Sequence, residues 1–361
     1  MTNKRLYLDI HAIQNLPPSN INRDDTGSPK TAQYGGVTRT RVSSQSWKRA
    51  IREYFNSNSQ AANVGVRTLD IVKYLAEKIL EKDPSLNMDQ AMDLADEIIN
   101  LAGIKTKDKR AKALFFLGND QAEDLAKAAL EGVKDPKALK EILRDNPAVD
   151  IALFGRMVAD DPSLNEDASC QVAHAISTHA IENEFDFFTA VDDLAPEDNA
   201  GAGMLGTVEF NSSTIYRYAN IALHELVHQL ADKESTLAAS KLFIEAFAKS
   251  LPTGKINTFA NQTLPQFLAV TLRTDRPVNL VSAFEEPIKS NTGYGKESIK
   301  KLAEEYKKAE KFADPEISTM YIAVEDIDGL DQIGDEKISL YNLLDDFEVE
   351  LAASLDKILG E

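Results

Sequence analysis

The sequence predicts an α+β fold, in which strands and helices are mixed without the regular βαβ spacing of a doubly wound sheet. Residues 6–10 form the first strand-like segment, because Leu6, Leu8 and Ile10 alternate with more polar residues, as in a half-buried strand. Residues 68–146 have the apolar spacing of several short helices, and strand-like segments resume after residue 148. These changes of pattern indicate a mixed sheet that is interrupted by a helical insertion.

A polar loop follows the first strand at residues 17–36, where Asn, Asp, Pro and Gly are frequent. A helix is predicted next, because Trp47, Ile51 and Phe55 lie at helical spacing and the serines before them are suitable N-caps.

The chain from residue 68 onward is predicted to contain a series of helices and then alternating strands and helices. Two apolar stripes mark its first helices, and they consist of Leu69, Val72, Leu75 and Ile79, then of Met92, Ala95, Ile98 and Ile99. Two more helices are predicted at residues 121–133 and 137–143. Strand-like segments are Val149–Met157, Val172–Thr178, Thr207–Ile221, Gln266–Leu272 and Met320–Val324, and the helices between or after them are Leu237–Leu251, Lys296–Phe312 and Ser339–Leu359.

The charge of the chain is unevenly distributed. The net charge is −18, but residues 1–60 carry nine Lys or Arg against four Asp or Glu. Such asymmetry provides a local surface that attracts phosphate on a body that repels it. The single cysteine, Cys170, excludes an internal disulfide. We find no signal peptide and no run of about 20 apolar residues, so a cytoplasmic protein without a membrane span is expected.

A basic stretch lies between residues 37 and 52 and contains no acidic residue. Its cations are Arg39, Arg41, Lys48, Arg49 and Arg52. The first two are two residues apart and share a face of a strand, while Lys48 and Arg52 share a face of a helix. Ser43 and Ser44 precede this helix, whose free N–H groups favour an anion. The stretch therefore predicts a surface that binds a nucleic-acid backbone through its phosphates. The alternative is a solvated basic helix face.

Two short motifs indicate other chemistry. His224, Glu225 and His228 match HExxH, in which two histidines bind zinc, but no later histidine can supply a third ligand. The glycines of residues 201–206 match GxGxxG, yet a strand follows where a dinucleotide site needs a helix. Both matches are interpreted as accidental, although a zinc metallohydrolase remains an alternative.

Two further groups have alternative roles. Asp24 and Asp25 could hold a divalent ion for RNA cleavage, or they are solvated turn residues. Phe185, Phe187 and Phe188 are either core residues or aromatic side chains that slide between bases.

Several longer blocks resemble the CasC family, the backbone (Cas-seven) subunit of the type I-E CRISPR Cascade complex. They recur in order between about residues 6 and 290 and are residues 20–27 (NINRDDTG), Lys30, Gly35-Gly36, 41–50 (RVSSQSWKRA), 149–157 (VDIALFGRM), 173–179 (AHAISTH), 187–194 (FFTAVDDL) and 216–220 (YRYAN).

The resemblance implies an RRM-like (ferredoxin-like) palm with a helical fingers insertion and a protruding thumb β-hairpin. The palm would comprise residues 1–59 and 149–361, the fingers residues 60–148, and the thumb about residues 183–212. Such proteins are not enzymes and need no cofactor. Several copies line up head-to-tail along a crRNA with other Cascade subunits, kink the crRNA periodically, and present it to target DNA in antiviral defence.

The resemblance also implies roles for individual residues. Those expected to hold crRNA phosphates are Lys30, Ser43, Gln45, Lys48, Arg49 and Arg52, with Asn22, Arg23, Arg39, Arg41 and Ser44 nearby. Those expected at the kink are Met157, Phe188, Thr189 and Val191, and Arg156 belongs to the same RNA-contacting set.

Overall fold

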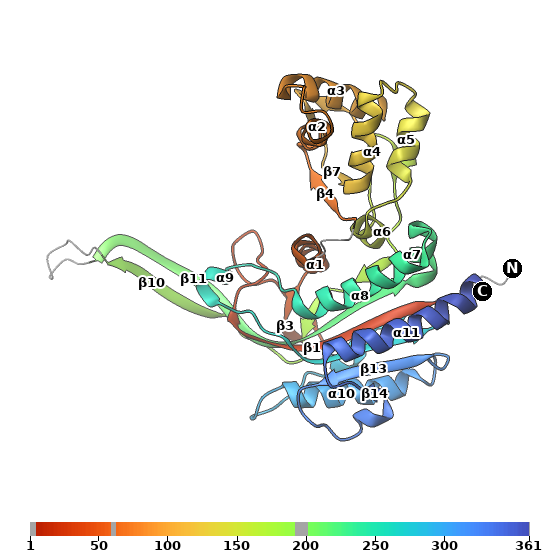
Figure 1. Ribbon diagram of the computed structural model, residues 1–361. Coiled ribbons are helices and arrows are strands. Elements are labelled where there is room, and N and C mark those ends of the chain that lie inside the picture. Colours follow the sequence, from red (N-terminus) through yellow and green to blue (C-terminus); the bar gives the residue numbers. More distant parts are fainter. Residues whose placement is uncertain (1–4, 59–62, 192–200, 361) are drawn as a thin grey trace.

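The protein is described by a computed structural model that covers residues 5–58, 63–191 and 201–360. Its large sheet contains the strands β1 (Tyr7–Ser19), β2 (Thr31–Tyr34), β3 (Val37–Val42), β8 (Cys170–Val172), β9 (Ala175–Ser177), β10 (Glu184–Val191), β11 (Gly201–Ala222), β12 (Pro265–Arg273), β13 (Ser318–Ala323) and β14 (Asp335–Glu336). The main path runs β14-β13-β12-β1-β11-β9-β3-β2, and β8 and β10 also pair with β11. The mixed α+β class is thereby confirmed (Figure 1).

Helices cover both faces of this sheet. One face is packed by α1 (Ser44–Asn58), α7 (Leu223–Leu230), α8 (Lys233–Lys249) and α11 (Leu340–Leu359). There, Ile10 of β1 belongs to the same core as Phe243 and Phe347. The other face is packed by α10 (Gly295–Ala309), whose Tyr306 shares a core with Ile13. Burial on both faces makes β1 a central strand, held by β11 and β12 as antiparallel neighbours.

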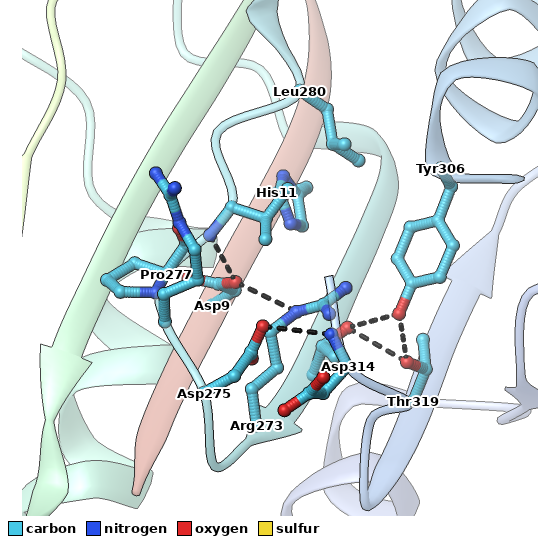
Figure 2. Close-up of polar contacts among 12 residues, drawn as sticks. Asp9, His11, Arg273, Asp275, Pro277, Leu280, Tyr306, Asp314 and Thr319 are labelled. Atoms are coloured by element: carbon cyan, nitrogen blue, oxygen red, sulfur yellow. Dashed lines mark hydrogen bonds and ion pairs between the residues drawn. The ribbon is translucent and has the colours of Figure 1, made fainter. Parts of the chain in front are cut away.

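The prediction of a half-buried first strand is therefore wrong. Asp9 and His11, on the face of β1 opposite Leu8 and Ile10, are buried as well. Figure 2 shows how Asp9 is accommodated: its carboxylate accepts the N–H of Val278 at 2.9 Å and lies 3.3 Å from Nε of Arg273. The buried Asp9, His11 and Gln14 of β1 are tolerated because each has a hydrogen-bond partner from a segment distant in the sequence.

The helical lobe, defined here as α2–α5 with β4 and β7, has a hydrophobic core of its own. Its elements are α2 (Ile71–Lys82), α3 (Met88–Leu101), α4 (Asn119–Leu130), α5 (Pro136–Arg144), β4 (Gly65–Thr68) and β7 (Phe115–Gly118), with the short β5 (Thr106–Lys107) and β6 (Arg110–Ala111) beside them. Both apolar stripes turn inward, as Leu75 and Ile98 illustrate. The lobe stands apart from the sheet in Figure 1, and its start at residues 59–62 lies outside the described residues.

The segment Val149–Met157 is not the strand that its apolar pattern predicts. Residues Val149–Phe154 form the short helix α6, whose first five side chains are all buried. A short, fully buried apolar run has no periodicity that separates a strand from a buried helix. The neighbouring prediction, a strand over Val172–Thr178, is divided in the structure between β8 and β9.

β10 and β11 form a long antiparallel hairpin, in which Phe187 pairs with Thr207 and Phe188 with Gly206. Figure 1 shows it extending away from the sheet, past α9 (Ile256–Phe259). The glycine-rich residues 201–206 are the first residues of β11, so a strand follows them, as predicted, and not a helix. Among the helices of the described residues, none is both long and apolar enough to cross a membrane.

Candidate nucleic-acid interface

The start of α1 is positioned by hydrogen bonds from a loop that is distant in the sequence. The side-chain oxygen of Asn22 accepts the N–H of Ser43 at 2.8 Å, and Oγ of Ser43 accepts the N–H of Ser46 at 3.3 Å. Ser43 is buried, Ser44 is partly exposed and Gln45 is exposed. Asn22 and Ser43 therefore position the helix start, and Ser44 and Gln45 face outward from it.

Of the cations of α1, Arg49 is exposed, and Lys48 and Arg52 are partly buried, whereas Trp47 and Ile51 are buried. Nζ of Lys48 lies 5.5 Å from the ring centre of Phe154. The side chain of Arg49 is 77% exposed and pairs with Glu53 on the next turn at 2.7 Å. An ion pair with this exposure contributes little stability, so Arg49 can exchange Glu53 for another anion at small cost.

These residues line a groove of about 530 Å³ between α1 and the helical lobe. α1 contributes Gln45, Lys48, Arg49 and Arg52 to it, and the lobe contributes Arg67, Leu114 and Phe116. The loop after α6 supplies Met157, whose side chain is 81% exposed. The groove thus combines cations on two walls with apolar side chains, a composition that suits a single-stranded nucleic acid.

A second hollow, of about 650 Å³, lies on the other side of Arg49. Arg23 and Lys255 line it, but so do Asp24, Asp25 and Glu53. Its cations and acids are therefore balanced, whereas in the groove the cations outnumber the two acids, Glu166 and Asp167.

The carboxylate of Asp24 accepts hydrogen bonds within its own turn. Its Oδ1 accepts the N–H and the hydroxyl of Thr26 at 2.9 and 2.7 Å, and the N–H of Ser28 at 3.0 Å. The hydroxyl of Thr26, followed by these N–H groups, lowers the pKa of Asp24. Among the described residues, no group of three His, Cys, Asp or Glu could hold a metal ion.

Lys30 and Arg41 lie next to each other on neighbouring segments of backbone. The N–H of Arg41 donates to the carbonyl of Lys30 at 2.9 Å, and Nε of Arg41 donates to the carbonyl of Thr31 at 3.2 Å. Its guanidinium also contacts Nδ1 of His174 at 3.2 Å. Burial, and then the charges of Arg41 and Lys30, lower the pKa of His174, so this histidine adds no positive charge near neutral pH.

Arg39 requires a correction, because it is buried and not part of the exposed basic surface. Its guanidinium donates to four backbone carbonyls, those of Tyr34 at 3.1 Å, Ser177 at 3.0 Å, Phe284 at 2.8 Å and Glu285 at 3.5 Å. Because these N–H donors are occupied, Arg39 holds the turn between β2 and β3 against the loop at Phe284. Its guanidinium cannot reach a phosphate in this structure.

Arg156 requires the same correction. It is buried, and it donates to the carbonyls of Leu164 at 3.0 Å and Leu143 at 2.5 Å and to the side chain of Gln121 at 3.2 Å. Burial lowers the pKa of Arg156 to about 10, which leaves it charged at neutral pH. Arg156 thus connects the loop after α6 with the helical lobe.

The hairpin holds the other predicted contacts, away from the groove (Figure 1). The Phe188 side chain is 41% exposed, and its ring lies so close to Gly206 that a Cβ there would be 2.3 Å away. Phe185 and Phe187 are exposed on the opposite face of the hairpin. Thr189 is exposed, and the side chain of Val191 lies outside the described part of the structure.

The HExxH residues do not converge on a metal site. Nδ1 of His224 lies 2.9 Å from the carbonyl of Leu6, and its ring packs edge-on against Tyr7. His228 is exposed on α7.

Sequence reasoning missed Arg67 and Lys255. Arg67 is exposed on β4 and lines the groove opposite α1. Lys255 lines the second hollow together with Arg49. Each is an isolated cation in its segment, so no local pattern marked either of them.

Comparisons with known proteins agree with one another. The family model described as CT1975-like protein matches residues 8–346. A chain from a solved CRISPR RNA-guided surveillance complex in a pre-nicking state is 35% identical, with a TM-score of 0.86, and the match covers 96% of this chain and 100% of that chain. A chain from another solved CRISPR RNA-guided surveillance complex is 30% identical, with a TM-score of 0.74 and coverage of 95% and 99%. No curated protein matches the chain.

Proposed function

Because the chain belongs to the CT1975-like protein family, we propose that it is a non-catalytic, crRNA-binding backbone subunit of a CRISPR surveillance complex. One observation carries this proposal: the chain matches, over nearly its whole length, a subunit chain of a CRISPR RNA-guided surveillance complex with a TM-score of 0.86. The groove beside α1 supports it, because its exposed cations suit a phosphate backbone.

We assign the complex to the type I-E Cascade on the sequence blocks described above. In this assignment the sheet and its helices are the RRM-like palm, the helical lobe is the fingers domain, and the β10–β11 hairpin is the thumb. The separate core of the lobe and the projection of the hairpin support this division. Several copies assemble head-to-tail along the crRNA, an open arrangement whose length the RNA sets.

The crRNA backbone runs along the groove. Lys48 and Arg49 contact its phosphates from α1, Arg67 contacts them from the lobe, and the start of α1 adds Ser44 and Gln45. Lys30, Arg23 and Arg41 extend the same basic side of the molecule. Because these are phosphate contacts, binding depends weakly on sequence and steeply on salt.

The kink in the crRNA is made by Met157 and Phe188. Within one chain these side chains lie in different places, one beside the groove and one on the hairpin. A wedge that contains both therefore takes Met157 from one copy and Phe188 from its neighbour. The crRNA between kinks stays available for pairing with target DNA, and other Cascade subunits complete the complex in the cytoplasm.

Neither alternative chemistry has an observation in its favour. The zinc metallohydrolase needs a third ligand near His224 and His228, and the ribonuclease needs free carboxylates at Asp24 and Asp25. The oxygen Oδ1 of Asp24 accepts three hydrogen bonds inside its turn.

The test is retention of RNA after co-expression with a CRISPR transcript. We would purify the wild-type chain, a Lys48→Ala/Arg49→Ala variant and a Lys300→Ala/Lys301→Ala control from α10 at low and high salt. The proposal predicts protected, uncut RNA in a multimer with the wild type and the control, and loss of RNA from the α1 variant while it stays folded. Equal retention by all three proteins, or RNA that is cut, would contradict it.

A further inference from the structure

A buried carboxylate joins the two walls of the groove. Asp150 of α6 is buried, and its two oxygens contact different parts of the molecule. Oδ1 accepts the N–H of Gly65, at the start of β4, at 2.8 Å. Oδ2 accepts Nε–H of Arg52, on α1, at 3.2 Å. A single side chain thus holds the first strand of the helical lobe against the helix that carries the groove cations.

Arg52 continues this connection into the lobe. Its guanidinium carbon lies 4.3 Å from the ring centre of Phe116, and its side chain is only 19% exposed. Phe116 of β7 is the cross-strand partner of Arg67 in β4, so the two side chains leave the same face of that strand pair. The contacts Asp150–Arg52–Phe116 therefore connect α1 with the strand pair that carries Arg67.

The ion pair between Asp150 and Arg52 is largely buried. Burial raises the pKa of Asp150, while the N–H of Gly65 and the charge of Arg52 act against that rise. A buried ion pair with such a desolvation cost contributes little net stability, and its use in fixing one arrangement is the better-supported role.

We propose that Asp150 is a positioning residue that sets the width of the groove, so that the cations of α1 and Arg67 can contact one RNA strand together. The inference rests on the proposed function, because it treats the groove as the RNA site. Arg52 then acts mainly through Asp150 and Phe116, and less as a direct phosphate contact.

The test combines a distance with an affinity. Spin labels on Asn56→Cys, at the exposed end of α1, and Asp124→Cys, on α4, report the separation of the walls, since both positions are exposed and Cys170 is buried. The variant Asp150→Asn can still accept the N–H of Gly65 but no longer pairs with Arg52. In this variant we expect a broader distribution of distances between the two labels. We also expect about tenfold weaker binding of single-stranded RNA, because coupled neighbouring residues commonly have an interaction energy of this size.

The matched control is Glu245→Gln. Glu245 accepts from Tyr54 of α1 at 3.0 Å and pairs with Lys249, so the variant removes an ion pair beside α1 that does not involve the lobe. It should change neither the label distance nor the RNA affinity.

The outcomes separate this proposal from the proposed function. Unchanged distance and affinity in Asp150→Asn, with RNA bound by the wild type, would overturn the positioning role alone. Absence of RNA binding by the wild type would overturn the proposed function, while the label distances would still decide whether Asp150 sets the groove. If Asp150→Asn does not fold, Phe116→Leu removes the stacking on Arg52 from the lobe side, and an unchanged distance there would overturn the proposal.

Discussion

The interior of the large sheet and the groove beside α1 both contain arginines, and the two regions use them for different purposes. In the interior, Arg217 is fully buried, with its guanidinium 3.8 Å from the ring centre of Trp47 and 4.3 Å from that of Phe247. It donates to the side chain of Gln14 and to the carbonyl of Phe247, each at 2.6 Å. In the groove, Arg49 and Arg67 are exposed and face solvent.

The difference shows that the buried arginine of the sheet interior donates its hydrogen bonds within the protein, whereas the groove arginines stay exposed. Arg39 and Arg156 behave like Arg217, since their donors are used by carbonyls and amides of distant segments. The exposed arginines of the groove can contact phosphate, whereas the buried arginines cannot. Variants of the buried arginines should therefore lower stability, and variants of the groove arginines should weaken salt-dependent RNA binding.

The largest effect is expected from Arg217→Ala. The variant loses two stacking contacts and two hydrogen bonds and leaves a cavity, so the free energy of unfolding should fall by about 3–5 kcal/mol. Denaturant unfolding measures this value, and Arg276→Ala, an exposed arginine, should change it by less than about 0.5 kcal/mol. Equal effects of the two variants would contradict the distinction between the regions.

The next effect concerns the groove. Lys48→Ala/Arg49→Ala/Arg67→Ala removes three phosphate contacts at about 1 kcal/mol each, so RNA binding should weaken roughly a hundredfold. The slope of log affinity against log salt should become about 2 units shallower, at about 0.7 per phosphate of single-stranded RNA. Titrations at several salt concentrations measure both quantities.

The control for this variant is Lys300→Ala/Lys301→Ala/Lys308→Ala, which removes the same charge from α10. If it changes the slope as much as the groove variant does, RNA responds to total charge and not to the groove.

A smaller effect is expected on the hairpin. Phe188→Ala should weaken binding to a crRNA-length RNA by about 1–2 kcal/mol, because one base–aromatic stack is lost. The same change at Phe185, on the opposite face of the hairpin, should have less effect. Competition binding with the two variants compares them directly, and a larger loss in Phe185→Ala would assign the wedge to the other face.

The smallest effect concerns the pH dependence of the sheet interior. Burial raises the pKa of Asp9 to about 6, against the hydrogen bonds from Tyr218 and Val278 and the charge of Arg273. Between about pH 4 and 6 the folded chain therefore keeps a proton on Asp9 that the unfolded chain has lost. The stability that this proton contributes falls as the pH rises through that range. Burial lowers the pKa of His11 to about 3, which has the opposite effect over the same range.

Asp9→Asn removes the first contribution and keeps the second. Its free energy of unfolding should therefore rise more steeply between pH 4 and 6 than that of the wild type, by at most about 1.4 kcal/mol per pH unit. Urea unfolding at a series of pH values measures the two slopes, and identical slopes would contradict the raised pKa of Asp9.

Local patterns in the sequence were sufficient for several elements. The spacing of Trp47, Ile51 and Phe55 correctly predicted the helix α1 and its buried face, because helical periodicity depends only on neighbouring residues. The strand after the glycine-rich residues 201–206 was predicted for the same reason.

Burial of charged residues could not be predicted in this way. Arg39 is buried where its guanidinium donates hydrogen bonds to carbonyls 138 and 245 residues further along the chain, and no local spacing encodes those partners. The groove has the same origin, since Asp150 and Phe116, which connect the strand pair of Arg67 with α1, are distant from α1 in the sequence. Tertiary contacts thus decided which cations of the basic stretch are exposed.

The most direct test of the account is photo-crosslinking of 4-thiouridine RNA to the wild-type chain, with the crosslinked peptides identified by mass spectrometry. We predict crosslinks in α1, in β4 and in the β10–β11 hairpin, and none in α10, α11 or β13. Crosslinks concentrated on α10 or α11, with α1 unmodified, would contradict the claim that the groove beside α1 is where the RNA binds.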